Sequence, residues 1–235
     1  MAWSADTEFD GFEERGFELE VQGRFVPGVY WTPRSGADRL IMLGHGGTTH
    51  KKTGYILTVA HLLLQKGFAA MAIDGPGHGD RDTTGISNGE EAEFERAWDQ
   101  GGGTKASTSD WIASLDFVES EYGNRPTGWW GLSMGTMMGI PVVAKENRIS
   151  AALLGLMGFW GPNKSDLERL APEITCPVRF LVQWDDEVVP IDSCLKLFEK
   201  LGTQKKTLHG NPGLHAKVPK FEISGSIDYL NRHVR

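Results

Sequence analysis

Short apolar runs recur along the chain and predict the strands of a buried sheet. Eight segments carry them: 17–21, 26–31, 40–43, 69–73, 128–131, 151–157, 177–184 and 205–209. The first of these alternates apolar and polar residues, as a half-buried strand does. The runs at 40–43 and 69–73 end in glycine-rich turns, which is typical of buried parallel strands.

Helical periodicity between these runs completes an α/β pattern. Apolar residues recur at helical spacing in 56–64 and 111–118, and a further helix is expected at 221–233. Ser107 or Ser109 is the expected N-cap of the second helix, because a hydroxyl side chain accepts a free backbone N–H there. The alternation predicts a mostly parallel sheet with helices on both faces, in a single domain of all 235 residues.

Residues 80–107 differ in composition from the rest of the chain. Acidic residues crowd the middle of this segment, and three consecutive glycines follow them. The composition predicts a loop with a short acidic helix, inserted between two regular units. Too few residues separate the strands at 151–157 and 177–184 for a separate cap domain, so this insertion is the expected partial lid.

Composition and charge narrow the classes of function. The chain is 40% hydrophobic and 23% charged, which describes an ordinary globular protein with a large core. A net charge of −7 argues against a general affinity for nucleic acid. No apolar run approaches a membrane span, and the N-terminus lacks the pattern of a signal peptide. Cys176 and Cys194 form no disulfide framework, so a reducing, cytoplasmic location is expected.

Two Gly-x-Ser-x-Gly pentapeptides occur, centred on Ser87 and Ser133. Such a turn lifts the serine hydroxyl above the preceding strand, where it can act as a nucleophile. Ser87 lies in the polar insertion with no apolar strand before it. Ser133 follows the strand at 128–131 and precedes a helix-compatible segment, so it is the expected nucleophile; a helix N-cap is its alternative role. Pro141 is expected to kink or shorten that helix, because proline cannot donate to the helical ladder.

Partners for this serine are expected after later strands, with the acid before the histidine in the chain. Asp185 and Asp186 follow the strand at 177–184. Asp186 is preferred, and Asp185 stays open because adjacent side chains point in different directions. After the last strand, a Gly-Asn-Pro-Gly loop leads to His215, whose reach over the sheet edge makes it the expected base. His209 competes with it but lies at the end of the strand.

Two backbone N–H groups are expected to form an oxyanion hole. Met134, directly after the expected nucleophile, supplies one of them. The turn after the strand at 40–43 reads Gly-His-Gly-Gly-Thr and supplies the other. Gly47 is the preferred donor in that turn, and Thr48 is the next choice.

A metal site is the alternative use of this region. His45, His50, Asp74 and His78 lie on neighbouring turns, but their spacing matches no ligand signature. A zinc ion there would also compete with the serine chemistry. We therefore expect no metal.

Together these motifs resemble the α/β-hydrolase superfamily along nearly the whole chain. The motifs are His-Gly-Gly at 45–47, Asp-Gly-Pro-Gly-His-Gly at 74–79, Gly-Leu-Ser-Met-Gly at 131–135, Asp-Glu-Val-Val-Pro at 186–190 and Gly-Leu-His at 213–215. Segment 26–33 is similar to the second strand of esterases in the dienelactone-hydrolase-like branch. The resemblance implies an eight-stranded sheet, a Ser-His-Asp triad and no cofactor.

Two features depart from that family pattern. Dienelactone hydrolases use a cysteine nucleophile, where this chain has Ser133, so their substrate is not implied. Thr136 follows the second glycine of the pentapeptide, where many relatives keep a further glycine.

The motifs and the resemblance predict a serine hydrolase that cleaves small-molecule carboxylic esters. Trp160 and Trp184 lie near strand ends and are candidate walls of an apolar substrate pocket. Lys51, Lys52 and Arg81 near the same edge hint at an acidic substrate. Thioesterase, amidase and carbon–carbon bond hydrolase activities on the same triad are alternatives, as is a ligand-binding protein that hydrolyses weakly. The sequence predicts neither the acyl and alcohol groups nor the oligomeric state.

Overall fold

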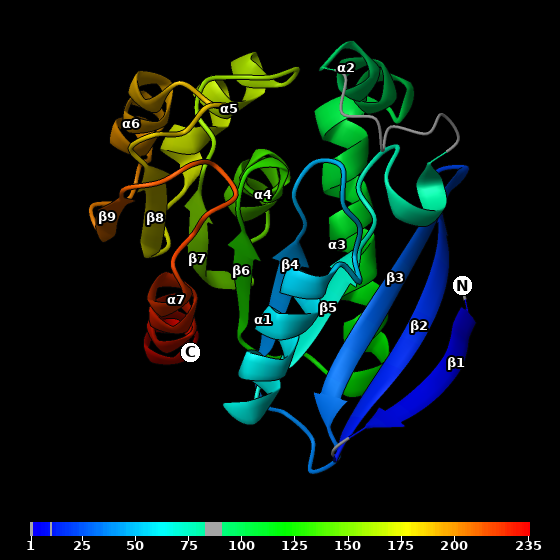
Figure 1. The fold of residues 1–235 in the computed structure, drawn as a ribbon. Helices are drawn as coiled ribbons and strands as arrows, with labels where there is room; N and C mark the ends of the chain where they lie inside the picture. The colour runs from blue at the N-terminus through cyan, green and yellow to red at the C-terminus, as the bar shows by residue number, and fades with distance from the viewer. Residues whose placement is uncertain (1, 10, 83–90) are drawn as a thin grey trace.

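The computed structural model describes residues 2–9, 11–82 and 91–235, which are layered around one sheet (Figure 1). The strand order is β1-β2-β3-β5-β4-β6-β7-β8-β9. The strands are β1 (Ala2–Phe9), β2 (Phe12–Val21), β3 (Arg24–Pro33), β4 (Leu40–Gly44), β5 (Ala69–Ile73), β6 (Thr127–Gly131), β7 (Ile149–Gly155), β8 (Val178–Gln183) and β9 (Lys206–Asn211). Strands β4 to β9 are parallel, and β1, β2 and β3 form an antiparallel extension at one edge. The expected mostly parallel sheet is confirmed.

Strand β1 is additional to the eight strands that the sequence predicts, so the sheet has nine strands in the described part of the chain. It lies at the edge of the sheet and pairs with β2. Trp3 anchors it, with its ring 5.9 Å from that of Phe17 and 4.9 Å from that of Phe117. Segment 2–9 has no apolar run, and for this reason the sequence pattern missed this strand.

Helices cover both faces of the sheet, as expected. Those in the described part of the chain are α1 (Gly54–Gln65), α2 (Glu91–Gln100), α3 (Gly103–Tyr122), α4 (Met134–Lys145), α5 (Lys164–Leu170), α6 (Ile191–Lys200) and α7 (Lys220–His233). Helices α1 and α7 pack on one face, and α3 to α6 pack on the other (Figure 1). Between β7 and β8 lie only α5 and a 3₁₀ turn (Ala171–Glu173), so no large cap is inserted between these two strands. None of the described helices has the length and apolarity needed to cross a membrane.

Helix α3 begins earlier than the sequence predicts. It starts at Gly103, after Gly102 has turned the chain with a φ of 85°. Ser107 and Ser109 therefore lie inside the helix, and the prediction that either one caps it is wrong. The Ser109 hydroxyl donates to the carbonyl oxygen of Ala106 at 2.9 Å instead. The run of glycines permits the earlier start because glycine adopts positive φ without a steric penalty.

Pro141 lies within α4, which continues to Lys145 and is not shortened by the proline. Proline has no N–H to offer the carbonyl oxygen one turn before it, which belongs to Met137. The side-chain amide of the buried Asn163 donates to this oxygen at 3.0 Å. An outside donor thus replaces the missing hydrogen bond of the helix.

The carboxyl ends of β4, β6, β8 and β9 lie at the same edge of the sheet, because these strands are parallel. The loops 45–53, 132–133, 184–190 and 212–219 leave from this edge. Crevices at this edge are where open α/β sheets bind their ligands. The expected catalytic residues are all in these four loops or directly after them.

Candidate active site

Ser133 occupies a strained turn between β6 and α4. Its φ of 58° and ψ of −123° are unfavourable for a residue with a side chain and cost on the order of 1–3 kcal/mol. A Cβ at Gly131 would lie 2.6 Å from the carbonyl oxygen of Gly135, and a Cβ at Gly135 would lie 2.3 Å from that of Gly44. The two glycines of the pentapeptide are therefore required by close backbone contacts. The turn projects the serine side chain from the sheet edge.

The expected nucleophile, base and acid form a continuous hydrogen-bonded chain. The Nε2 atom of His215 lies 2.9 Å from Oγ of Ser133. On the other side of the ring, Nδ1 lies 2.8 Å from Oδ2 of Asp186, whose side chain is nearly fully buried. Oδ1 of this aspartate accepts the backbone N–H groups of Val188 and Val189 at 2.9 and 2.8 Å. These two hydrogen bonds fix the carboxylate plane against the imidazole ring.

Asp185 and Glu187, the neighbours of Asp186 in the chain, accept backbone hydrogen bonds from the loop 212–219, which carries His215. Oδ2 of Asp185 accepts the N–H of Gly213 at 2.8 Å. Oε2 of Glu187 accepts the N–H of His215 at 2.8 Å, and this hydrogen bond lowers the pKa of Glu187. Of the two candidate acids, Asp186 therefore contacts the imidazole of His215, and Asp185 contacts the backbone of the loop 212–219.

Met134 and Gly47 both line the cavity in front of the serine hydroxyl. Among the described residues, neither of their N–H groups has a hydrogen-bond acceptor. The N–H of Gly46, by contrast, donates to the hydroxyl of Tyr55. Thr48, the second choice for the donor, follows with a φ of 58°. Unpaired N–H groups beside a nucleophile are what an oxyanion hole requires.

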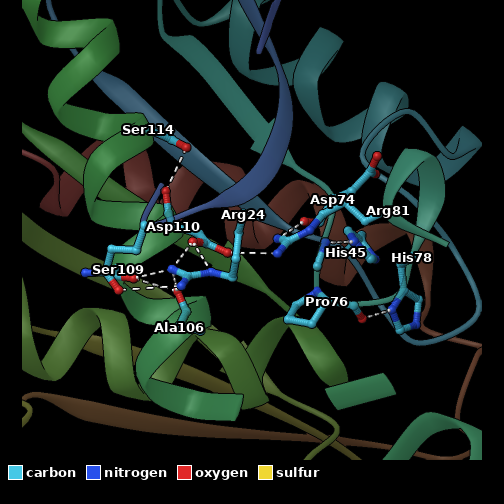
Figure 2. Close-up of polar contacts among 12 residues, drawn as sticks. Arg24, His45, Asp74, Pro76, His78, Arg81, Ala106, Ser109, Asp110 and Ser114 are labelled. Carbon is cyan, nitrogen blue, oxygen red and sulfur yellow. Dashed lines mark hydrogen bonds and ion pairs between the residues drawn. The ribbon is translucent and has the colours of Figure 1, made fainter. Parts of the chain in front are cut away.

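His45 connects the loop after β4 to the turn after β5 (Figure 2), and its side chain is fully buried. Its Nε2 accepts the N–H of Gly75 at 2.9 Å, so the ring proton is on Nδ1, which donates to the carbonyl oxygen of Gly46 at 2.8 Å. Burial, with the nearby His78 as a smaller cause, lowers the pKa of His45 from 6.5 to about 4. A neutral imidazole thus positions the backbone next to Gly47.

Acid is expected to destabilise the protein through His45. Below pH 6.5 the unfolded chain binds a proton at this position and the folded chain does not, so stability falls as the pH drops towards 4. The expected contribution is a loss on the order of 2–3 kcal/mol over this interval. Urea unfolding at pH 7 and pH 4.5 should show a smaller pH dependence in His45→Gln than in the wild type. His61→Gln, on the exposed side of α1, is the control; equal pH dependence in all three proteins would contradict the prediction.

The residues considered as metal ligands have other partners in the structure. Both ring nitrogens of His45 are hydrogen-bonded, and Nδ1 of His50 accepts the N–H of Lys52 at 3.2 Å. The carboxylate of Asp74 accepts the N–H and the ammonium of Lys51 at 2.8 and 2.6 Å. In the described part of the chain, no group of three or more histidine, cysteine or acidic residues is arranged to hold a metal ion.

The three basic residues near this edge are neutralised by acidic neighbours. The ion pairs join Lys51 to Asp74 and Asp80, Lys52 to Glu14, and Arg81 to Asp110. Figure 2 shows that Asp110 is also held by Arg24, so two arginines share one buried carboxylate. As far as the structure describes the chain, none of the three lines a cavity beside Ser133. The hint of an acidic substrate is therefore not supported.

Two cavities flank the serine hydroxyl. The larger, of about 650 Å³, lies between α2, α4 and the loop 184–190, called the acid loop below. Trp160 lines this cavity, with 39% of its surface exposed. The smaller, of about 310 Å³, lies on the side of His215. Among the described residues that line the two cavities, Trp184 does not occur, which corrects its expected role. Its half-exposed indole instead packs over Gly210, where a Cβ would lie 2.1 Å from the ring.

His209 was the alternative candidate for the base, and Ser87 was the alternative candidate for the nucleophile. His209 lies within β9, two residues before the strand ends, and its Nε2 lies 3.1 Å from Oγ1 of Thr207. Ser87, at the centre of the second pentapeptide, lies outside the described residues. The structure therefore places His215, and not His209, beside the expected nucleophile.

Two residues support the site through hydrogen bonds that the sequence did not predict. Tyr55 accepts the N–H of Gly46, and Thr136 joins the start of α4 to the end of β7. The Thr136 hydroxyl lies 2.8 Å from the carbonyl oxygen of Gly131 and accepts the N–H of Gly155 at 2.7 Å. In the sequence, the departure from the family pattern at Thr136 indicated such a role, because a buried hydroxyl needs hydrogen-bond partners.

The fold and the turn at Ser133 define an α/β-hydrolase, and the comparisons with known proteins agree. A family model described as serine aminopeptidase, S33, matches residues 35–158, so the chain belongs to this family of serine hydrolases. The chain is therefore an enzyme of the hydrolase class, as the sequence predicted. No curated protein sequence matches it.

Solved structures give a similar result. A PEG-bound cold-adapted esterase from an Arctic intertidal metagenomic library is 58% identical, with all of both chains covered (100%) and a TM-score of 0.95. A dienelactone hydrolase from Anabaena variabilis is 18% identical, with 96% of this chain and 100% of that chain covered and a TM-score of 0.75. An esterase from Pyrococcus furiosus is 16% identical, with 95% and 94% covered and a TM-score of 0.74. The last two similarities establish the fold alone.

Proposed function

We propose that the chain hydrolyses carboxylic esters of small molecules through an acyl-enzyme. The single observation that carries this proposal is the chain of contacts from Ser133 through His215 to Asp186, with distances of 2.9 and 2.8 Å. A serine hydroxyl is a weak nucleophile until a positioned base takes its proton. The similarity to an esterase at 58% identity supports esters as the substrate class.

In the proposed mechanism, Ser133 Oγ attacks the acyl carbon while His215 Nε2 takes its proton. Asp186 accepts a hydrogen bond from the Nδ1–H group of His215, keeps its negative charge and stabilises the imidazolium that forms. The imidazolium then protonates the leaving alcohol oxygen, which departs and leaves the acyl group on the serine. A water molecule, activated by the same histidine, releases the acid and restores the serine.

The N–H groups of Met134 and Gly47 are proposed to hold the oxyanion in both steps. Their unpaired state supports this role, because a donor already committed to the protein could not serve the substrate. Loss of one such donor typically costs about 3–4 kcal/mol of transition-state stabilisation. The links from His45 and Tyr55 to Gly46 keep this loop in place without occupying the donor of Gly47.

Helix α2 is proposed to belong to a partial lid, within an insertion at 80–107 in a single domain. Phe94 and Glu95 of this helix line the larger cavity, so α2 forms part of the wall of the proposed substrate site. A cytoplasmic location remains a prediction of the sequence.

A fluorophosphonate probe tests the proposed nucleophile. The probe is expected to attach to the peptide that holds Ser133, and mass spectrometry of a digest identifies the site. Ser87→Ala is the matched control, since it removes the serine of the other pentapeptide and should leave labelling unchanged. Labelling of the Ser87 peptide, or no labelling of the folded protein, would contradict the proposal. Parallel assays with a thioester and an amide distinguish the alternative substrate classes.

A further inference from the structure

We propose that the larger cavity binds the acyl group and the smaller cavity binds the leaving alcohol. The enzyme then prefers esters of a small alcohol with a larger acyl group that carries no negative charge. This inference rests on the proposed function, because it assigns the two sides of the same serine.

The position of the histidine decides which cavity takes the alcohol. His215 Nε2 must reach both the serine oxygen and the oxygen of the leaving group, so the leaving group must lie beside His215. The smaller cavity is lined by His215 together with Ala216 and Val218 of the same loop. The larger cavity is lined by Met134 and by the acid loop, and His215 is not among its described lining residues. The acyl group, on the other side of the carbonyl carbon, is directed into the larger cavity.

The two cavities differ in volume and in the residues of their walls. The larger, of about 650 Å³, contains the flexible side chains of Met134, Met137 and Met157, which adapt to ligands of different shape. The smaller, of about 310 Å³, is near the lower limit for a ligand pocket and is bounded by Trp130 and Leu156. The protein is therefore expected to tolerate added carbon atoms on the acyl side better than on the alcohol side.

Every charged side chain among the described lining residues of the larger cavity is negative. Glu95 and Glu187 line it together with the proposed catalytic Asp186, and no lysine, arginine or histidine is among its described lining residues. The ammonium group of Lys51 forms an ion pair with Asp74. An acyl chain that ends in a carboxylate would lose water in this cavity and gain no partner there. Dicarboxylic half-esters are therefore expected to be poor substrates.

Two isomeric esters test the assignment of the cavities. Methyl hexanoate and pentyl acetate have the same atoms and differ in the side of the ester that carries the longer chain. The value of kcat/KM for methyl hexanoate is expected to be at least about tenfold higher. An equal or higher value for pentyl acetate would overturn the assignment. Labelling of Ser133 by the fluorophosphonate reports on the proposed function separately, so the two failures are distinguishable.

One variant in each wall links the preference to its cavity. Trp160→Ala removes a partly exposed wall of the larger cavity. It is expected to lower kcat/KM for methyl hexanoate about fivefold and to lower that for pentyl acetate less, because an acetyl group fills less of this cavity. Val218→Ala, in the smaller cavity, is expected to raise kcat/KM for pentyl acetate with little effect on methyl hexanoate. The opposite pattern in the two variants would overturn the proposal.

A matched pair of methyl esters tests the charge preference. Methyl pentanoate and monomethyl glutarate have acyl chains of equal length, and the second ends in a carboxylate. The neutral ester is expected to be the better substrate by about tenfold, and Glu95→Gln should narrow this gap about threefold. Glu199→Gln removes an exposed charge that lines neither cavity and should leave the gap unchanged. Equal rates on both esters in the wild type would overturn the charge preference.

Discussion

Ser133→Ala is expected to lower kcat/KM for methyl hexanoate by about 10⁴- to 10⁶-fold. Alanine keeps the backbone and the cavities but removes the oxygen that forms the acyl-enzyme. The oxyanion donors and the binding cavities would remain, so a small residual rate above that of water is expected. Steady-state kinetics with a sensitive detection of released acid measures the loss.

The folding of this variant is a necessary control. Alanine must adopt the same φ of 58° as Ser133, so the strain of the turn is retained and the thermal unfolding midpoint should change little. Ser87→Ala should keep the wild-type rate. If Ser133→Ala kept more than about a tenth of the activity, the acyl-enzyme mechanism proposed for this protein would be wrong.

Asp186→Asn is expected to lower kcat by about 10³- to 10⁴-fold. Oδ1 of Asp186 accepts the N–H groups of Val188 and Val189, so an asparagine would place its oxygen there and turn its NH₂ group towards His215. The imidazole would then carry its proton on Nε2, where it could no longer accept the proton of Ser133. A pH–rate profile and the comparison of kcat with KM measure this loss, which should fall mainly on kcat.

Asp185→Asn is the matched control for this loss. Its carboxylate accepts one backbone N–H, from Gly213, and an amide oxygen accepts the same hydrogen bond. The variant is expected to lose less than about tenfold in kcat. A larger loss in Asp185→Asn than in Asp186→Asn would reverse the assignment of the acid.

Much of the fold was predictable from the chain because its signals are local. Runs such as 40–43 and 69–73 are short, fully apolar and followed by glycine-rich turns, which identifies buried parallel strands without knowledge of their neighbours. The edge strand β1 has no such run, and its anchor Trp3 acts through aromatic contacts distant in sequence. The start of α3 was misplaced because the three glycines before it allow several backbone paths.

The candidate site was predictable for a related reason. Loops that follow parallel strands meet at one sheet edge, so Ser133, the acidic pair at 185–186 and His215 could be expected together from their order alone. The order could not show which acid faces the imidazole. That depends on how the loop turns after β8, which is set by the N–H groups of Val188 and Val189.

The sequence by itself thus determined the class of fold, the strained turn at Ser133 and the loops that carry its partners, because each is encoded in residues close together in the chain. The tertiary structure alone decided the direction of Asp186, the pairing of Lys51 and the exclusion of Trp184 from the cavities. It also decided the unequal volumes beside the serine. These features arise where side chains from distant segments pack together, and local patterns carry no information on that packing.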